Sequence, residues 1–387
     1  MKKVVIVAAK RSPISKIPGE LNYINETELV ALVVKDVSIG LEHHIDEAIL
    51  GSSFPVERDN LCRKAIIKAG LSPKIPASTI SKTCASSDEA LLLGYNKIAC
   101  LQAKAVLVCG SEKISNSSYA LHFLKKNVKR SVQNSLQEYT EVLDGIQEND
   151  MVYINEMLAK KFAVSRREQD EFTIQSIRKA KKANQRGYFI NEIVPVSQEH
   201  TGGNGLHTDE WLSLERKEEE VRSAPPMFIV DGCITQYNAA PISDVAVAMV
   251  LMEYDLAQKL GIKPMAFLHG IMSTGVENDQ MGMSMTDCVK KMLYKNNLSL
   301  SAIDLFEINE SFAVQALCTM NTLGLFNDRV NVNGGNLALG YPIGATGLRM
   351  SVSLLYEMKK KQVEYGMSVM CAGGNMANGV IFKNIHN

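Results

Sequence analysis

The chain has 387 residues, of which 46% are hydrophobic and 22% are charged, as in ordinary globular proteins. Lys and Arg together number 42, and so do Asp and Glu, so no net charge favours binding to nucleic acid or to an anionic membrane. A chain of this length is too long for one simple core, and two or three domains are expected. No apolar run approaches the ~20 residues of a transmembrane helix. We therefore expect a soluble protein of the cytoplasm.

The eight cysteines are scattered, at positions 62, 84, 100, 109, 233, 288, 318 and 371. No CxxC pair occurs, and no histidine lies at metal-ligand spacing from a cysteine. Scattered cysteines in a large chain are typical of reduced thiols in a reducing compartment. We expect free thiols and no metal site.

The first predicted elements are a buried strand at Val4–Ala9 and, further along, a strand that leads through a short turn into a helix. That second strand includes Thr79–Ser81, and the helix runs from about Ser86 to Gln102. The apolar residues at helical spacing, which we expect to be buried, are Leu92, Leu93, Ile98 and Leu101. Cys84 lies in the turn, where the amides and dipole of the helix favour a thiolate. A lone cysteine is more often a small core residue, so this position alone is a weak signal.

The two ends of the chain resemble each other, which indicates an internal duplication. Strand-like runs alternate with helical patterns in both, as in parallel sheets covered by helices. The matched segments are 45–54 with 303–312, 105–110 with 367–373, and the turns 84–87 with 344–347.

The middle of the chain, from about residue 112 to 240, breaks this rhythm and is predicted to be an insertion lying over the two lobes. It contains one clear helix from about Ser165 to Arg186, because Ser165 and Glu168 form a capping box and Gly187 can end the helix. A basic group also lies here, consisting of Lys125, Lys126, Lys129 and Arg130. It fits a solvated helical face better than a contact to phosphate or to a carrier protein.

Four segments carry the chemistry, and on them the chain resembles the biosynthetic thiolases of the acetyl-CoA C-acetyltransferase type. Thiolases carry a Cys-Ala-Ser-Gly nucleophile turn, an Asn-Glu-Ala-Phe segment, a glycine-rich Gly-His-Pro segment and a terminal Cys-x-Gly-Gly. All four occur in order and at similar spacing. They are Cys84-Ala85-Ser86-Ser87, Asn309-Glu310-Ser311-Phe312, the segment Asn333–Gly347, and Cys371-Ala372-Gly373-Gly374.

The resemblance implies a mechanism that needs no metal or prosthetic group. Cys84 attacks an acyl thioester and becomes acylated. Cys371 then removes the α-proton of a second acyl-CoA, and the carbanion attacks the acyl-cysteine. Backbone amides near Cys84 and Gly373, and a water positioned by Asn309, hold the developing oxyanions. Coenzyme A thioesters are the implied substrates, with no covalently bound cofactor.

The principal departure from the family pattern is Tyr341, which stands where the Gly-His-Pro histidine is expected. A phenol with a reference pKa of about 10 is a poor base at neutral pH, although it donates hydrogen bonds. Losing a positioned acid–base group typically costs about 10²–10⁴ in rate. His269 and His207 are weak candidates for a replacement. Tyr341 is therefore counted with Cys84, Cys371, Asn309 and Gly373 as the candidate catalytic set.

Further departures concern the nucleophile turn and the coenzyme A contacts. Asp88 and Glu89 follow the turn, where they either raise the pKa of the thiol by repulsion or harmlessly charge the helix start. The family's pantetheine-contacting serine is Ala240, an expected arginine is displaced to Arg222, and a family histidine aligns with Asp150. The candidate substrate-binding residues are Met151, Arg222, Asn238, Ala240 and Phe312.

Three functions remain open on the sequence. The first is a thiolase-type acyltransferase that forms or cleaves a 3-ketoacyl thioester by Claisen chemistry. The second is a condensing or acyl-transfer subunit supplied by a carrier protein or a partner. The third is a catalytically impaired homologue with a binding or assembly role.

The predicted fold is α/β, with two duplicated lobes that each hold a mixed five-stranded sheet in a layered αβαβα arrangement. The first lobe spans residues 1–113 and 243–263, the inserted loop domain 114–242, and the second lobe 264–387. The resemblance also implies a homodimer or homotetramer.

Overall fold

The computed structural model describes residues 2–55, 59–116, 151–203, 205–227, 229–277 and 282–385. The basic group between Lys125 and Arg130, and Asp150, lie outside these residues, so the interpretations placed on them stay predictions. The strands are β1 (Val4–Arg11), β2 (Glu47–Gly51), β3 (Ala77–Ile80), β4 (Ala105–Glu112), β5 (Val245–Glu253), β6 (Ala266–Gly275), β7 (Leu305–Ile308), β8 (Tyr365–Ala372) and β9 (Met376–Asn384).

The described strands form a mixed sheet in the order β3-β2-β4-β5-β1-β6-β9-β8-β7. Its first five strands belong to the amino-terminal half and its last four to the carboxy-terminal half. Only two residue pairs, Val5 with Phe267 and Ile6 with Ala266, join the halves at β1 and β6. The position of a fifth strand in the second half is held by a single parallel bridge between Phe306 and Val330. The predicted α/β thiolase architecture is confirmed, but the described strands form one sheet of nine rather than two sheets of five, because the segment at Val330 makes an isolated bridge instead of a fifth strand.

The strand register confirms the internal duplication and corrects one of its alignments. β2 pairs in parallel with β4, and β7 pairs in parallel with β8. Ala48 lies beside Leu107, while its counterpart Phe306 lies beside Met367. Counting from these pairs, the counterpart of Cys371 is Ser111. The likeness of Cys109 to Cys371 in sequence is therefore offset by two residues from the true structural match.

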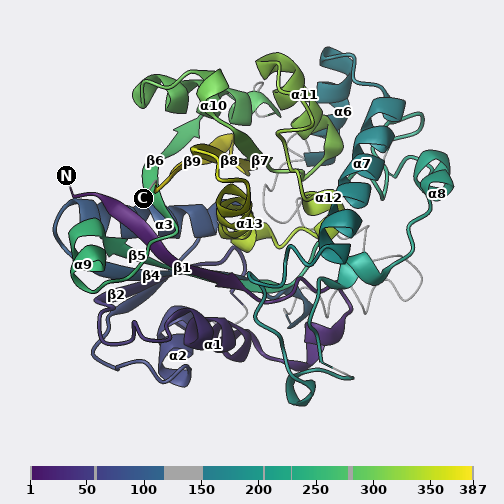
Figure 1. Cartoon of the computed structure of the whole chain (residues 1–387). Coiled ribbons are helices and arrows are strands. Elements are labelled where there is room, and N and C mark those ends of the chain that lie inside the picture. Colours follow the sequence, from purple (N-terminus) through teal and green to yellow (C-terminus); the bar gives the residue numbers. More distant parts are fainter. Residues whose placement is uncertain are drawn as a thin grey trace.

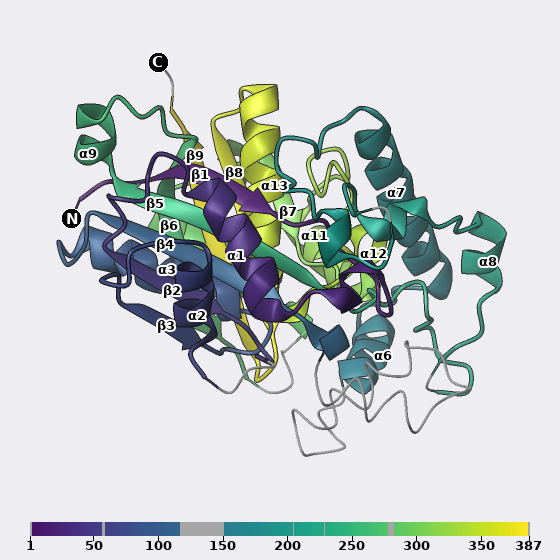
Figure 2. The same cartoon turned by 90° about the horizontal axis from the view of Figure 1, so that it is seen from below.

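Helices cover both halves of this sheet in layers, and two of them lie between the halves (Figure 1). The outer helices of the first half, α1 (Glu26–Val37) and α2 (Leu61–Lys68), cross one face of its sheet (Figure 2). The central layer holds α3 (Ser86–Ala99) and α13 (Thr346–Lys361), and α10 (Ser284–Lys295) covers the far face of the second half of the sheet. The remaining described α-helices are α6 (Met151–Lys161), α7 (Arg166–Gln185), α8 (Glu218–Ser223), α9 (Tyr254–Lys259), α11 (Ala313–Leu323) and α12 (Asn336–Leu339).

The central strands and helices are buried because apolar side chains occupy both faces of the sheet. Every residue of β4 and β5 is buried. α3 follows the predicted turn but ends at Ala99, three residues earlier than predicted. Leu101 lies beyond that end at a φ of 63° and is exposed, so its predicted burial was wrong. Leu91, which precedes the predicted apolar residues, is fully buried instead.

The segment between β4 and β5 is tied to the first half by buried ion pairs. α7 begins at the predicted capping box of Ser165 and Glu168, and Gly187 follows its end at a φ of 69°. Arg11 of β1 is fully buried, and its guanidinium lies 2.6 Å from Asp209 and 2.7 Å from Glu192. Both carboxylates belong to the inserted segment, so charge pairing fixes this segment against β1.

None of the helices within the described part of the chain is both long and apolar enough to cross a membrane.

Candidate active site

Cys84 lies in a tight turn between β3 and α3, at the centre of the molecule. Thr83, the residue before it, adopts a φ of 48°, a left-handed conformation that is costly for a β-branched residue. Two hydroxyls hold this turn by donating to the Thr83 carbonyl, from Ser53 at 2.5 Å and from Ser86 at 2.6 Å. The strained turn is therefore held by its surroundings, and it projects a half-buried Cys84 thiol toward the second half of the chain.

Burial, rather than the helix, dominates the electrostatics of Cys84. Removal of the thiol from water raises its pKa above the ordinary value. Hydrogen bonds from the Tyr341 hydroxyl and from the Gly373 backbone amide oppose this shift because they stabilise a thiolate. The expectation that the helix start alone would favour a thiolate is therefore wrong, since burial has the larger effect on the pKa.

The two carboxylates after the nucleophile turn are not among the largest influences on the pKa of Cys84. Glu89 is bound by Lys82 at 2.6 Å. The Asp88 side chain is buried, and its Oδ1 has no hydrogen-bond partner within the described residues, so burial raises its pKa to about 7. The acid whose charge does raise the pKa of Cys84 is Glu112, at the end of β4. Repulsion of the thiol by Asp88 or Glu89 stays a prediction, while Glu112 is a carboxylate that the sequence had not offered.

Glu112 joins the two halves beneath the nucleophile turn. Its carboxylate accepts backbone N–H groups from Gly344 at 2.6 Å, Phe54 at 3.2 Å and Ser53 at 3.3 Å. Burial nevertheless raises its pKa to about 8. Through these three hydrogen bonds Glu112 links the turn before α13 to the segment at Ser53, whose hydroxyl holds the Thr83 carbonyl.

Cys371 comes from the end of β8, in the other half of the chain, and is buried. Its thiol donates to the Gln315 Oε1 at 3.4 Å and lies 3.7 Å from the Asn309 Nδ2 and 3.9 Å from the Ser311 Oγ. Burial raises its pKa to about 12, and the nearby Cys84 raises it as well, while the hydrogen bonds from Ser311 and Asn309 lower it. The second cysteine is thus a weak acid whose thiol is surrounded by polar side chains.

Tyr341 lies between the two cysteines. Its hydroxyl is hydrogen-bonded to the Cys84 thiol and to Ser311, and its ring is buried. Burial raises its pKa well above 10, and the neighbouring Cys84 and Cys371 raise it further. A phenol in this position stays protonated, so it can donate a hydrogen bond to an anion but cannot act as a base near neutral pH.

The candidate catalytic residues predicted from sequence therefore meet at one place. Cys84, Tyr341, Asn309 and Cys371 are joined by the contacts above, and the Gly373 amide faces the Cys84 thiol. The Gly373 carbonyl also accepts a hydrogen bond from the Thr83 hydroxyl at 3.5 Å.

Three of the predicted substrate-binding residues line the wall beside this group. The Ala240 amide donates to the Ser311 carbonyl at 2.9 Å, and the Ala313 amide donates to the Asn238 carbonyl at 2.8 Å. Phe312 is buried and bridges to Ala239 in an antiparallel arrangement. This wall continues to Tyr341, whose amide donates to the Pro241 carbonyl at 2.7 Å.

Met151 and Arg222 occupy different surroundings. Met151 begins α6 and packs, partly buried, against the same apolar cluster as Phe312. Arg222 lies on α8 and is bound to Glu171 at 3.1 Å and to Glu218 at 3.2 Å. The structure thus leaves the guanidinium of Arg222 engaged in surface ion pairs, away from the cysteines.

Neither histidine considered as a replacement for the family histidine reaches the site. His269 belongs to β6 and packs edge-on against Tyr365, with ring centroids 5.4 Å apart. His207 is exposed in a loop of the inserted segment. Within the described residues, Tyr341 is the group that occupies the position between the thiols.

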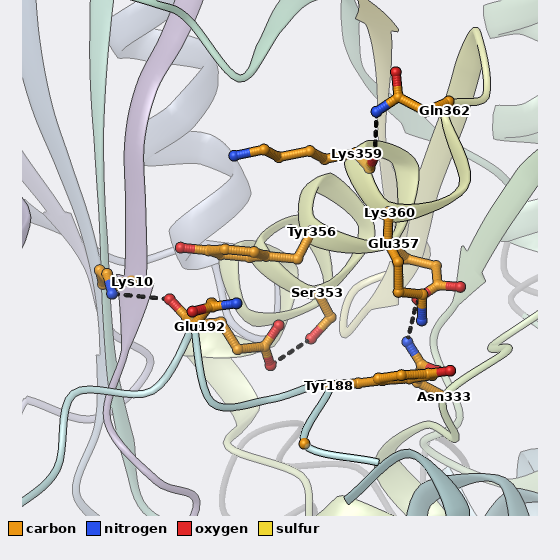
Figure 3. Close-up of a pocket in the computed structure, with 12 residues that line it drawn as sticks. Lys10, Tyr188, Glu192, Asn333, Ser353, Tyr356, Glu357, Lys359, Lys360 and Gln362 are labelled. Atoms are coloured by element: carbon orange, nitrogen blue, oxygen red, sulfur yellow. Dashed lines mark hydrogen bonds and ion pairs between the residues drawn. The ribbon is translucent and has the colours of Figure 1, made fainter.

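A separate polar cavity, of about 620 Å³, opens near the other end of α13 (Figure 3). Lys10, Tyr356 and Lys359 line it together with two carboxylates. Those carboxylates are already paired, Glu192 with Arg11 and Glu357 with Lys360. None of the predicted site residues lines this cavity.

Sequence reasoning missed the residues that support the site rather than those that form it. Glu112 could have been found as a carboxylate at the end of a buried strand, and Asn336 as a polar residue within the glycine-rich segment. Gln315 and Arg349 carried no such signal, because their positions in α11 and α13 read as ordinary helical residues.

Comparisons with known proteins show the family of the chain. Family models described as "Thiolase, N-terminal domain" and "Thiolase, C-terminal domain" match residues 4–255 and 262–384. The chain belongs to the thiolase family.

Its relatives include enzymes of acyl transfer. An acetyl-CoA acetyltransferase of Chromobacterium violaceum is 36% identical over 384 residues, covering 97% of both chains. A probable acetyl-CoA acyltransferase of Staphylococcus aureus is 35% identical over 385 residues, covering 97% of this chain and 98% of the relative.

Two solved structures have the same fold over nearly the whole chain. Acetyl-CoA acetyltransferase of Bacillus anthracis is 32% identical and superposes with a TM-score of 0.90, covering 100% of this chain and 99% of the other. Human mitochondrial 3-ketoacyl-CoA thiolase, solved in complex with CoA, is 29% identical, with a TM-score of 0.90 over 99% of this chain and 98% of the other.

Proposed function

We propose that this chain is a thiolase-type acyltransferase that uses acyl-CoA and is acylated on Cys84. The observation that carries the proposal is the meeting of Cys84 from the first half with Cys371 from the second, close enough that each thiol raises the pKa of the Tyr341 hydroxyl and Cys84 raises that of Cys371. Two thiols are needed because the reaction has two tasks, holding an acyl group and removing a proton. Membership of the thiolase family supports the same reaction class.

In the first step the Cys84 thiolate attacks the carbonyl carbon of acetyl-CoA. The bond from that carbon to the coenzyme A sulfur breaks, and coenzyme A leaves as a thiolate that takes up a proton. The Gly373 amide and the Tyr341 hydroxyl, which already contact the Cys84 sulfur, can donate to the negative charge. Because Tyr341 stays protonated, the Cys84 proton is lost to solvent rather than to this neighbour.

In the second step Cys371, as thiolate, takes an α-proton from a second acetyl-CoA. The resulting carbanion attacks the acetyl carbonyl on Cys84, a carbon–carbon bond forms, and the Cys84 thiolate is released. Asn309 directs its side-chain N–H group toward Cys371 and so lies where a donor can stabilise the enolate oxygen. Thiolysis is the reverse of these steps.

The direct test is the intact mass of the protein after incubation with acetyl-CoA, beside a Cys84→Ala variant. We expect one acetyl group on the wild type and none on the variant. Absence of an adduct with acetyl-CoA and with longer acyl-CoAs would contradict the proposal. The same assay with an acylated carrier protein would then distinguish a carrier-fed subunit from an impaired homologue.

We also propose that the protein acts in the cytoplasm as a homodimer or homotetramer. In support, β3 lies at the edge of the sheet and pairs with β2 on one side, so its other edge is open to a strand of a second copy within the described residues. Light scattering of the purified protein tests this, because a monomer at micromolar concentration would contradict it.

A further inference from the structure

A buried chain of hydrogen bonds runs from the active site into the core of the second half. The Asn336 Nδ2 donates to the Asn309 Oδ1 at 2.6 Å, and the Arg349 Nη2 donates in turn to the Asn336 Oδ1. All three side chains are no more than 1% exposed. Asn309 completes the chain by donating to the Ser311 Oγ at 2.8 Å and toward the Cys371 Sγ at 3.7 Å.

Arg349, at the inner end of this chain of hydrogen bonds, fixes the direction of each of them. A guanidinium only donates hydrogen bonds, so the carbonyl of Asn336 must face Arg349. The NH₂ group of Asn336 then faces Asn309 and requires its carbonyl oxygen, which leaves the NH₂ group of Asn309 directed at Cys371. Turning either amide around would place donor against donor or acceptor against acceptor among side chains that are no more than 1% exposed.

The burial of Arg349 is energetically unfavourable, because two of its guanidinium nitrogens make no hydrogen bond within the described residues. Its Nε and Nη1 have no hydrogen-bond partner among the described residues, and the nearest carboxylate, Glu307, lies 3.8 Å from Nη1. A buried arginine with unmatched donors destabilises a fold relative to an apolar side chain of similar size. The hydrogen bond that it does make within the described residues is to the Asn336 carbonyl, the first step of the path to Cys371.

We propose that Arg349 and Asn336 are positioning residues that lock the Asn309 amide with its N–H group toward Cys371. The inference rests on the proposed function, in which that N–H group stabilises charge that develops beside Cys371. Neither Arg349 nor Asn336 touches a reacting atom, and both act through Asn309 alone.

The test is a double-mutant cycle in a Cys84→Ala background, scored by the rate at which iodoacetamide alkylates Cys371. Peptide mass spectrometry follows the labelled cysteine, so the measurement does not depend on acyl-CoA. Asn336→Asp keeps the size of the side chain and still accepts from Arg349, but it cannot donate to Asn309. The Asn309 amide then turns its carbonyl toward Cys371, and we expect alkylation to slow about 10-fold, the loss of one donor to a thiolate.

The same substitution in an Asn309→Ala protein should change the rate less than about 2-fold, because no amide remains to be turned. Equal slowing with and without Asn309 would overturn the proposal, since a charge acting through space needs no intermediary. Arg349→Met should slow alkylation, and Arg349→Lys, which keeps a donor-only group, should restore most of the rate. If Arg349→Lys were as slow as Arg349→Met, the orientation argument would be wrong.

In the protein with Cys84 intact, Asn336→Asp should lower kcat for condensation about 10-fold or more and leave KM for acetyl-CoA within about 3-fold. The matched control is Asn321→Asp, the same change at an exposed position of α11. A wild-type protein that acetyl-CoA does not acylate would count against the proposed function, while the alkylation cycle would still report the state of the Asn309 amide.

Discussion

The two halves of this molecule share one strand order but contribute different groups to the site. In the first half the turn before the central helix carries Cys84, and the matching turn before α13 carries Gly344. By the register of the strands, Asn309 and Cys371 of the second half correspond to Gly51 and Ser111 of the first. The duplication therefore fixes where chemistry can be placed, at the ends of the inner strands and the starts of the inner helices, and each half uses different positions within that pattern.

The halves also differ in what holds them in place. The first half is bound to the inserted segment through Arg11, whereas the second half is organised around the buried chain that ends at Arg349. Single substitutions can separate these contributions.

Arg11→Met removes the cation that Glu192 and Asp209 share and leaves both carboxylates buried. Breaking a buried pair in this way costs about 3–5 kcal/mol, so urea unfolding should show a loss of that size. The control is Lys2→Met, because the Lys2 ammonium that pairs with Glu253 and Asp255 is open to solvent, so its loss should be much smaller than that of Arg11. If Arg11→Met and Lys2→Met lost the same free energy of unfolding, burial would not make the Arg11 ion pairs more stabilising than exposed ones, and the prediction would be wrong.

Asp88→Asn tests the buried carboxylate between α3 and α13. Because burial raises the pKa of Asp88 to about 7, the folded protein favours the protonated form. Its contribution to stability is present below about pH 4 and is lost as the pH rises through 7. The variant should therefore nearly match the wild type at pH 4 and exceed it by about 4 kcal/mol at pH 8. Urea unfolding at several pH values measures this, and a difference that does not change with pH would contradict the account.

Tyr341→His places a base between the two thiols. A positioned acid–base group is worth about 10²–10⁴ in rate, so acylation by acetyl-CoA at pH 7.5 should rise about 10²-fold. Tyr356→His, in the same helix as Arg349 but hydrogen-bonded to the Ala9 carbonyl, is the matched control and should change nothing. No gain from Tyr341→His would show that the site has diverged from the thiolase reaction elsewhere.

Tyr341→Phe removes only the hydroxyl that contacts Cys84 and Ser311. Loss of one hydrogen bond to a thiolate costs roughly 1.5–3 kcal/mol, so acylation should slow about 10-fold or somewhat more. Without this hydrogen bond the pKa of Cys84 rises further. The acylation rate should therefore reach its maximum only at a higher pH than in the wild type. Stopped-flow acylation across pH 7–10, with Tyr356→Phe as control, follows both effects, and an unchanged profile would remove Tyr341 from the site.

Much of this could be predicted from the sequence because it depends on local pattern. The turn at Cys84, the capping box at Ser165 and the likeness of the two halves are all properties of short segments, and the structure confirms them. The domain boundaries stay a prediction.

What sequence could not supply depends on distance across the fold. The sequence offered Asp88 and Glu89 as the carboxylates near Cys84, but not Glu112, whose charge raises the pKa of the thiol. The same holds for the pKa of Cys84, where the helix start suggested a lower value and burial raises it. Leu101 shows a smaller failure, since the helical spacing continued past the true end of α3.

The measurement that tests the account most directly compares Cys84→Ala with Cys371→Ala in two assays, acylation by intact mass and condensation of acetyl-CoA. If the halves divide the reaction as proposed, Cys371→Ala still accepts one acetyl group, Cys84→Ala accepts none, and both lose condensation by about 10⁴-fold or more. An acetyl group found on Cys84→Ala but not on Cys371→Ala would contradict the division of tasks between the two halves.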